Sequence, residues 1–368
     1  MRISKIVKPL CFVGLVCVIN MLLSFCMEWA NGASATMWQQ YYAEEEIDIV
    51  FVGASVCSAS FAPEVFDERL GKNSFNMGTP AQMTEQSIRA LEVALEEHEP
   101  ETVIYGMGFF ALQQEGSEEA EMTFVKALSR EQGGLKGLKT GMEYLLSETV
   151  RDKEKSVKYF FPWLYNGVDY SVDEIANNIK AKLDTTAEEF DPHSEEEKNW
   201  RLEKGFRPFT GVVNYDTAWE SNSHQFYYQH FDYASTYYFQ KLLELCSEKG
   251  VDLIVINSPH PTFDLVSCYD TYEMNHELVK EMCEEYGVEY YDFSLAKPEL
   301  FDAKEDYFYD FEHLNYEGAT AFSNAVCDLL EMRESGKLSS DMFYSVEEYM
   351  QLHEELIEEW ESFNLFLQ

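Results

Sequence analysis

The residues best suited to chemistry are a serine and a histidine that lie far apart along the chain. Ser55 follows the apolar run 47–52, which ends at Gly53, and this position faces the carboxyl edge of a sheet, where open α/β folds bind ligands. A serine hydroxyl is a poor nucleophile unless a neighbouring base accepts its proton. His313 is the candidate base, because it follows the last predicted strand and belongs at the same edge.

Asp310 stands three residues before His313, in the sequence Asp-Phe-Glu-His-Leu-Asn. In a compact loop this carboxylate can orient the imidazole and stabilise its protonated form while the other ring nitrogen faces the serine. Together the three side chains predict acyl transfer through a Ser-His-Asp arrangement. Each also has an ordinary alternative, since Ser55 could cap the next helix and the Asp310/His313 pair could be a solvated loop.

Two other residues are weaker candidates. Cys57 is a rival nucleophile just beyond Ser55, but a small buried thiol is the more ordinary role. His260, in Ser-Pro-His-Pro after the fourth predicted strand, fits a substrate-loop or structural residue better than a base. We find no zinc-protease, EF-hand or P-loop motif, and we expect neither a metal nor a cofactor.

Short apolar runs alternate with helical patterns along most of the chain. The predicted strands are 47–52, 74–77, 102–105, 251–257 and 288–292, and the predicted helices include 84–98, 234–249 and 273–286. This alternation predicts a three-layer α/β/α, flavodoxin-like fold with one mostly parallel five-stranded sheet. Ser55 and the Asp310/His313 pair then meet at its carboxyl edge.

Residues 111–233 interrupt this rhythm and are predicted to be a mostly helical insertion in an α/β domain of residues 47–332. Its aromatic clusters, 159–163 and 226–228, either cap a binding cleft or pack onto the sheet, and packing is the preferred interpretation. The acidic tail, 333–368, carries an apolar stripe that we expect to dock on its own domain. Residues 29–46 are predicted to be a linker.

Residues 1–28 are predicted to be a cytoplasmic flank and a transmembrane anchor. Arg2, Lys5 and Lys8 precede an uncharged run, 9–27, which as a helix nearly spans a bilayer core of roughly 30 Å. The positive flank predicts a cytoplasmic N-terminus in the cell membrane and an extracytoplasmic body. Signal cleavage near the small residues 30–35, giving a secreted protein, is the alternative. We prefer the uncleaved anchor because the run exceeds the roughly 7 to 15 residues of a signal core.

Charge and cysteine content exclude several function classes. Acidic residues number 67 against 27 basic ones, a formal charge of -40, which repels phosphate backbones and argues against nucleic-acid binding. None of the eight cysteines forms a CxxC pair, so zinc-ribbon and thioredoxin-type sites are not expected. The spacing also shows no disulfide scaffold.

Three blocks of this sequence resemble those of the SGNH (GDSL-like) hydrolase superfamily. They are Gly53-Ala54-Ser55, Asn76-Met77-Gly78 and Asp310-x-x-His313-Leu-Asn. More narrowly, the chain resembles the exported, membrane-anchored bacterial branch, which includes DltD-like proteins and proteins working beside membrane-bound O-acyltransferases. The resemblance covers roughly 47–110 and 235–332.

The resemblance implies a role for each matching residue. Ser55 is the nucleophile, His313 the general base and Asp310 its orienting carboxylate, while the backbone N–H groups of Ser55 and Gly78 bind the oxyanion. Asn76 and Gln82 complete the expected oxyanion and substrate-binding set. The family's third block usually supplies an Asn in a Gly-x-Asn context, but this chain reads Tyr-Gly-Met-Gly at 105–108. Gln82 or a backbone N–H of the turn 106–108 is the candidate substitute.

The resulting functional prediction is an extracytoplasmic serine esterase or O-acyltransferase. Its expected substrate is an acylated glycan or cell-envelope polymer, and the negative charge favours a neutral polysaccharide over a polyphosphate. A multi-spanning membrane O-acyltransferase is the expected partner. The alternative is a non-catalytic binding or scaffolding subunit of such a system, which the missing third-block Asn favours.

Overall fold

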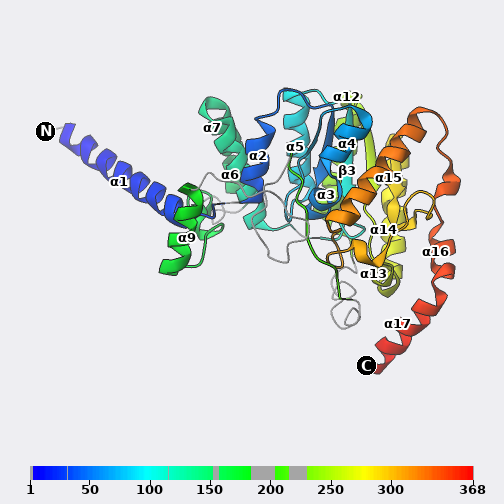
Figure 1. Cartoon of the computed structure of the whole chain (residues 1–368). Coiled ribbons are helices and arrows are strands. Elements are labelled where there is room, and N and C mark those ends of the chain that lie inside the picture. Colours follow the sequence, from blue (N-terminus) through cyan, green and yellow to red (C-terminus); the bar gives the residue numbers. More distant parts are fainter. Residues whose placement is uncertain are drawn as a thin grey trace. The chain divides into compact units, whose positions relative to one another are not determined.

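The computed structural model describes residues 3–30, 32–114, 116–151, 157–183, 204–214 and 230–367 (Figure 1). The chain divides into two compact units. Unit 1 consists of Met1–Gln39 and Glu118–Glu188, and unit 2 consists of Gln40–Ser117 and Glu189–Gln368. This division differs from the predicted boundaries, because most of the insertion groups with the N-terminal helices and not with the α/β domain.

Unit 2 is built on one five-stranded sheet of short, largely buried strands. The strands are β1 (Ile49–Gly53), β2 (Ser74–Asn76), β3 (Thr102–Met107), β4 (Asp252–Asn257) and β5 (Glu289–Asp292). Their order is β2-β1-β3-β4-β5 and every pairing is parallel. The predicted α/β fold and its five strands are therefore confirmed, with a fully parallel sheet in the order typical of flavodoxin-like folds.

Helices cover the two faces of this sheet. They are α3 (Ser55–Ser60), α4 (Pro63–Leu70), α5 (Thr84–Glu97), α12 (Tyr233–Lys249), α13 (Thr262–Ser267), α14 (Tyr269–Tyr286) and α15 (Tyr316–Glu334). Successive side chains of a strand point to opposite faces. On β3, Ile104 joins a buried cluster with Phe322 of α15, whereas Tyr105 contacts Phe239 of α12. The glycines at 250 and 287 end α12 and α14 in the left-handed conformation.

The acidic tail packs on unit 2 through its apolar stripe, as expected. It contains a short 3₁₀ turn, Ser340–Met342, and the helices α16 (Val346–Leu352) and α17 (Glu354–Leu367). Val346 and Tyr349 are buried in a cluster with Phe109 and Tyr272. The Tyr349 hydroxyl donates to Thr262 Oγ1 at 3.0 Å, which fixes the tail beside α13.

Unit 1 is helical. It contains α1 (Ile3–Met27), most of α2 (Ala33–Tyr41), α6 (Glu118–Gln132), α7 (Gly134–Arg151), the 3₁₀ turn η1 (Pro162–Leu164) and α9 (Val172–Leu183). Within α1, Val7–Met27 is apolar enough to cross a membrane, with a mean hydropathy of 2.5 over 21 residues. The predicted linker 29–46 is not a plain linker, since it contains the helix α2. This helix packs into the fold through Trp38, which is buried and lies edge-on against Phe124, with ring centroids 5.3 Å apart.

Of the two aromatic clusters of the insertion, the structure describes one. Cluster 159–163 lies in unit 1, where the Tyr159 ring packs against Tyr144 and the Phe160 carbonyl accepts from Asn20 of α1. Its contacts within unit 1 are with α1, α7 and α6, where the Lys126 ammonium lies 4.7 Å from the Tyr159 ring. Packing of the insertion onto the sheet stays a prediction. The second cluster, 226–228, lies outside the described residues.

Candidate active site

Two glycines allow the chain to turn sharply after β1 and place Ser55 at the sheet edge. Gly53 and Gly106 are neighbours in the parallel register of β1 and β3. A Cβ on Gly53 would lie 2.1 Å from the Gly106 carbonyl oxygen, and one on Gly106 would lie 2.4 Å from the Phe61 ring. α3 therefore starts directly beside β3. Ser55 is its first residue, so the Ser55 N–H is one of the initial amides without an intrahelical acceptor.

Asn76, at the end of β2, fastens that strand to α3. Its fully buried amide donates to the carbonyls of Cys57 and Phe61, both at 2.9 Å, and its Oδ1 accepts the Gly78 N–H at 2.9 Å. These bonds hold α3 in place under Ser55. The Gly78 N–H is occupied by Asn76 in this structure, and its role at an oxyanion stays a prediction.

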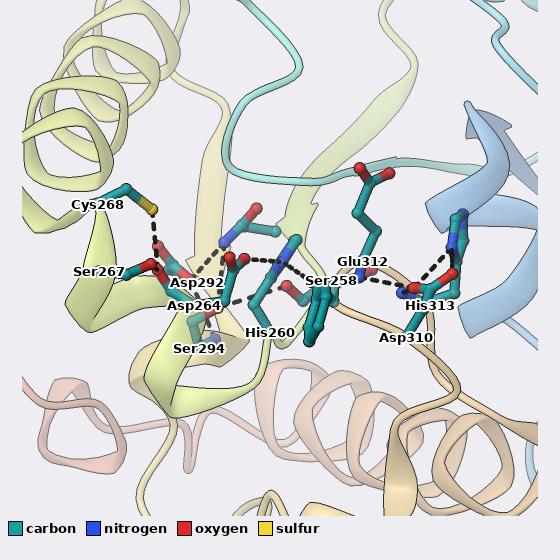
Figure 2. A network of polar contacts seen from close by, with 12 residues as sticks. Ser258, His260, Asp264, Ser267, Cys268, Asp292, Ser294, Asp310, Glu312 and His313 are labelled. Carbon is teal, nitrogen blue, oxygen red and sulfur yellow. Dashed lines mark hydrogen bonds and ion pairs between the residues drawn. The ribbon is translucent and has the colours of Figure 1, made fainter. Parts of the chain in front are cut away.

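The structure brings Ser55, His313 and Asp310 together although Ser55 is far from the other two along the chain. His313 Nε2 lies 2.9 Å from Ser55 Oγ. Its other ring nitrogen, Nδ1, lies 3.0 and 2.9 Å from the two carboxylate oxygens of Asp310, the contact that Figure 2 shows. The His313 side chain is 13% exposed, and Asp310 is more open at 40%. The site therefore borders solvent.

The electrostatics of Asp310 set the roles of the two ring nitrogens. Burial raises the pKa of this carboxyl, but hydrogen bonds and charge from His313 outweigh it and hold the pKa below its ordinary value. The backbone N–H groups of Glu312 and His313 also donate to it, at 2.8 and 2.7 Å. An ionised carboxylate only accepts, so Nδ1 carries the proton. Whenever the ring has lost its second proton, Nε2 is the acceptor for the Ser55 hydroxyl.

The loop that carries Asp310 and His313 is closed at its base. The Tyr309 N–H donates to the His313 carbonyl at 2.9 Å, and the Asn315 N–H donates to the Tyr307 carbonyl at 2.9 Å. Asn315 also caps α15, since its side chain accepts the Gly318 N–H at 2.9 Å. These bonds give the tight loop that the Asp-x-x-His spacing requires.

A part of the insertion that the sequence did not single out lies against the histidine. The Phe209 ring packs at 5.0 Å from the His313 ring and stacks on Tyr309 at 4.6 Å, while the Arg207 guanidinium lies 5.5 Å from the Phe209 ring. The Arg207 N–H donates to the Ser58 carbonyl at 2.8 Å. One aromatic residue of the insertion thus borders the site, although no motif in Arg-Pro-Phe marks it.

His260 lies beside the loop that carries Asp310 and His313 (Figure 2). Its side chain is buried, with Nδ1 3.1 Å from the Phe311 carbonyl oxygen and 3.4 Å from Asp264 Oδ2. A Cβ on Gly108 would lie 3.2 Å from Nε2, so this nitrogen faces the turn after β3. These contacts fit a structural residue of the loop, the role that its Ser-Pro-His-Pro context favours.

The remaining candidates, Cys57 and Gln82, are buried inside the fold. Cys57 is fully buried, and burial raises the pKa of its thiol far above the ordinary value, which disfavours a thiolate nucleophile. Gln82 is also buried. Its Oε1 accepts from Thr79 Oγ1 at 2.8 Å and its Nε2 donates to Ser87 Oγ at 3.2 Å, so its expected role at an oxyanion stays a prediction.

Comparison with known proteins gives limited likeness. A protein-family model with no stated function matches residues 198–333, less than half of the chain. No curated protein matches. A solved structure from Bacteroides fragilis, described as a "putative acylhydrolase", is 10% identical with a TM-score of 0.35, and the alignment covers 82% of this chain and 95% of that one. A likeness this distant carries no argument about function, which must come from the site.

Proposed function

We propose that unit 2 is a serine esterase or O-acyltransferase with Ser55 as nucleophile, His313 as general base and Asp310 as the orienting carboxylate. The observation that carries this proposal is the 2.9 Å contact between Ser55 Oγ and His313 Nε2, with Asp310 bound to the opposite ring nitrogen. This is the geometry that activates a serine hydroxyl. The His313 ring is mostly buried, and its contact with Asp310 holds it in one orientation.

The chemistry divides into two steps. Ser55 Oγ attacks the carbonyl carbon of an ester while its proton passes to His313 Nε2, and the carbonyl electron pair moves onto oxygen. When the tetrahedral intermediate collapses, the C–O bond to the alcohol breaks and His313 returns the proton to the leaving oxygen. Water or an acceptor hydroxyl then attacks the acyl-Ser55 ester with His313 again as base, which gives hydrolysis or transfer.

Stabilisation of the oxyanion rests on backbone amides. The Ser55 N–H, at the start of α3, is the first donor. The Gly78 N–H is the second and would share its hydrogen bond with Asn76, which it already contacts. Loss of one such donor typically costs about 10² to 10³ in rate.

The proposed setting is the outer face of the cell membrane, with α1 as a single-pass anchor. The substrate would be an acylated glycan or cell-envelope polymer, and a multi-spanning O-acyltransferase would be a partner. The formal charge of -40 favours an uncharged polysaccharide over a polyanion. Phe209, which packs against His313, would border the acyl or sugar group.

Active-site labelling tests this function. We expect the full-length protein in detergent to react with a fluorophosphonate, and the label to appear on the peptide that contains Ser55. Ser55→Ala removes the reaction. Ser58→Ala, one turn further along α3, is the matched control and should still be labelled. Labelling of Ser55→Ala at the wild-type rate would refute Ser55 as the nucleophile.

A non-catalytic binding subunit is the second candidate. The observation that favours it is that the Gly78 N–H is already paired with Asn76, in a chain that lacks the family's third-block Asn. His313→Ala separates the two functions. Glycan binding that persists in this variant, with no reaction of wild-type Ser55, would favour the binding subunit, whereas an enzyme loses most of its rate.

A further inference from the structure

The C-terminal end of α1 is capped by residues from the insertion. The last carbonyls of a helix have no intrahelical partner and need donors from elsewhere. Lys182 Nζ donates to the carbonyls of Ser24 and Phe25 at 3.1 and 2.8 Å. Asn178 Nδ2 donates to those of Cys26 and Glu28 at 3.0 and 2.9 Å. The end of α1 is thus held by α9, which lies against it in Figure 1.

The same region also binds α1 further along its apolar run. Asn20 Nδ2 donates to the Phe160 carbonyl at 2.8 Å, and Trp163 Nε1 donates to Asn20 Oδ1 at 2.9 Å. The Asn20 side chain, inside an apolar helix, therefore finds both an acceptor and a donor in the segment around η1. We call residues 157–183 the collar, because they contact α1 at its end and near Asn20.

These contacts argue that α1 stays attached to the folded protein. Cleavage near residues 30–35 would remove the carbonyls that Asn178 and Lys182 bind. It would also remove Glu28, whose mostly buried carboxylate pairs with Arg130 at 2.8 Å. Unit 1 would lose its longest helix, and the side chains of Asn178, Lys182 and Arg130 would lose these partners.

The level of Asn20 places part of the collar at membrane depth. Val7–Met27, with 21 residues, is about as long as a bilayer core of roughly 30 Å is thick. Asn20 lies about two helical turns, or roughly 10 Å, before Met27. If α1 spans the bilayer, the collar residues that bind Asn20 must therefore lie within the outer leaflet.

The exposed side chains of this region suit such a position. Phe160 is 53% exposed, Leu164 is 52% exposed, and Trp29, just beyond α1, is 54% exposed. The half-buried Trp163 presents its indole N–H to Asn20. Aromatic residues of this kind are enriched where membrane and water meet. Since the chain is strongly acidic, contact with a membrane would depend on these side chains and not on a basic surface.

We propose that the collar is a membrane-contact surface that stays bound to the uncleaved α1 and inserts Phe160 and Leu164, with Trp29, into the outer interface of a phospholipid bilayer. The occupant is lipid, because the surface is continuous with the apolar helix that the bilayer must cover. Entry of these side chains into the interface then fixes the position of α1 relative to the membrane surface. This inference is independent of the chemistry at Ser55.

Photo-crosslinking to lipid tests the contact. The full-length protein, with Leu164→p-benzoylphenylalanine, is placed in phosphatidylcholine vesicles and irradiated. We expect an adduct with the mass of one phospholipid, mapped to the peptide that contains residue 164. The matched control is Leu352→p-benzoylphenylalanine, since Leu352 is a similarly exposed leucine (61%) in α16 of unit 2, and it should yield at least ten times less adduct.

The other outcomes overturn the proposal. An intact mass showing a mature chain that begins after residue 28 would exclude the retained anchor. Equal lipid adducts at 164 and 352, or none at 164, would exclude the membrane contact. A crosslink in cells from residue 164 to another membrane protein, and not to lipid, would show that a protein and not lipid covers this surface. Fluorophosphonate labelling of Ser55 in both variants reports separately on unit 2, so failure of the proposed function is recognised independently.

Discussion

Asp310 controls which nitrogen of His313 carries the proton, and an amide at this position should disrupt that control. In Ser-His-Asp enzymes the change from Asp to Asn lowers kcat by about 10⁴-fold, because the imidazole adopts the wrong tautomer. We expect Asp310→Asn to slow hydrolysis of p-nitrophenyl acetate by roughly 10³- to 10⁴-fold. Asp306→Asn, an exposed carboxylate nearby, is the control and should keep its rate. Equal rates in the two variants would exclude the orienting role.

The lowered pKa of Asp310 also predicts how stability depends on pH. A carboxyl whose pKa is lower in the folded state stabilises the protein above its unfolded pKa, and the effect is lost as the pH falls through the folded value. Urea unfolding should therefore show the largest difference between wild type and Asp310→Asn near neutrality. The difference should shrink once the pH falls below the ordinary Asp value of about 3.9. A difference independent of pH would contradict this assignment.

His260 is expected to position the loop that carries Asp310 and His313 through its Nδ1. An Asn side chain places its N–H₂ near the Nδ1 position, whereas Gln places it near Nε2. His260→Ala should lower the fluorophosphonate inactivation rate by about 10²-fold, the effect of a small misplacement of the reacting groups. His260→Asn should recover most of this loss because it can still donate to the Phe311 carbonyl.

Two further readouts separate positioning from a general loss of fold. His260→Ala should increase amide hydrogen exchange in 308–316 while exchange in the strands stays unchanged, and the inhibition constant should change less than the inactivation rate. Recovery by His260→Gln in place of His260→Asn would show that Nε2, and not Nδ1, is the important nitrogen.

At the residue scale, sequence order predicted more than side-chain contact did. Ser55, Asp310 and His313 could be found because each follows a strand that ends at the same edge of a parallel sheet. Phe209 could not be found, because its packing on His313 depends on how the insertion returns to unit 2. The hydrogen bonds of Asn76 to α3 and to the Gly78 N–H could not be predicted either, since a motif does not show which atoms a side chain bonds.

Asn76 connects two elements, the end of β2 and α3, and its removal should destabilise unit 2. Asn76→Ala leaves the Phe61 carbonyl and the Gly78 N–H without this partner, and each such group costs about 1 to 3 kcal/mol, whereas the Cys57 carbonyl still accepts the Phe61 N–H. Asn324→Ala, at a half-buried position of α15, should cost less than about 1 kcal/mol. Urea unfolding measures both. If the two variants are equally stable and only Asn76→Ala loses labelling, Asn76 positions the Gly78 N–H for the reaction and is not needed for stability.

Among the elements, those with a strong local pattern were predicted best. The five strands are short, β-branched or aromatic runs, and the stop signals at Gly250 and Gly287 fixed the ends of α12 and α14. The helix α2 was missed because its buried residues, such as Trp38, find their partners in α6 across a long stretch of sequence. Tertiary packing decided this helix, and no local pattern predicts it.

The division of the whole chain was the least predictable feature. The insertion interrupts the α/β domain in sequence, but its helices group with α1, because Asn178, Lys182 and Trp163 supply the polar partners that α1 needs. Composition gave the apolar helix and the acidic body separately. It could not show that one part of the body binds the C-terminal end of that helix, since these contacts join residues more than a hundred positions apart.

The charge of the whole molecule predicts a preference among substrates. A net charge of -40 lowers the local concentration of anions near the site. Raising NaCl from about 10 mM to 1 M shortens the Debye length from about 30 Å to about 3 Å, which removes most of this repulsion. The kcat/KM for an anionic ester, the p-nitrophenyl monoester of succinate, should therefore rise several-fold over this range. The kcat/KM for neutral p-nitrophenyl butyrate, of similar size, should stay constant.

A higher rate for the anionic ester at low salt would contradict this preference. It would indicate that a local cation such as Arg207, whose guanidinium lies over Phe209, outweighs the charge of the body. A polyanionic substrate would then be acceptable.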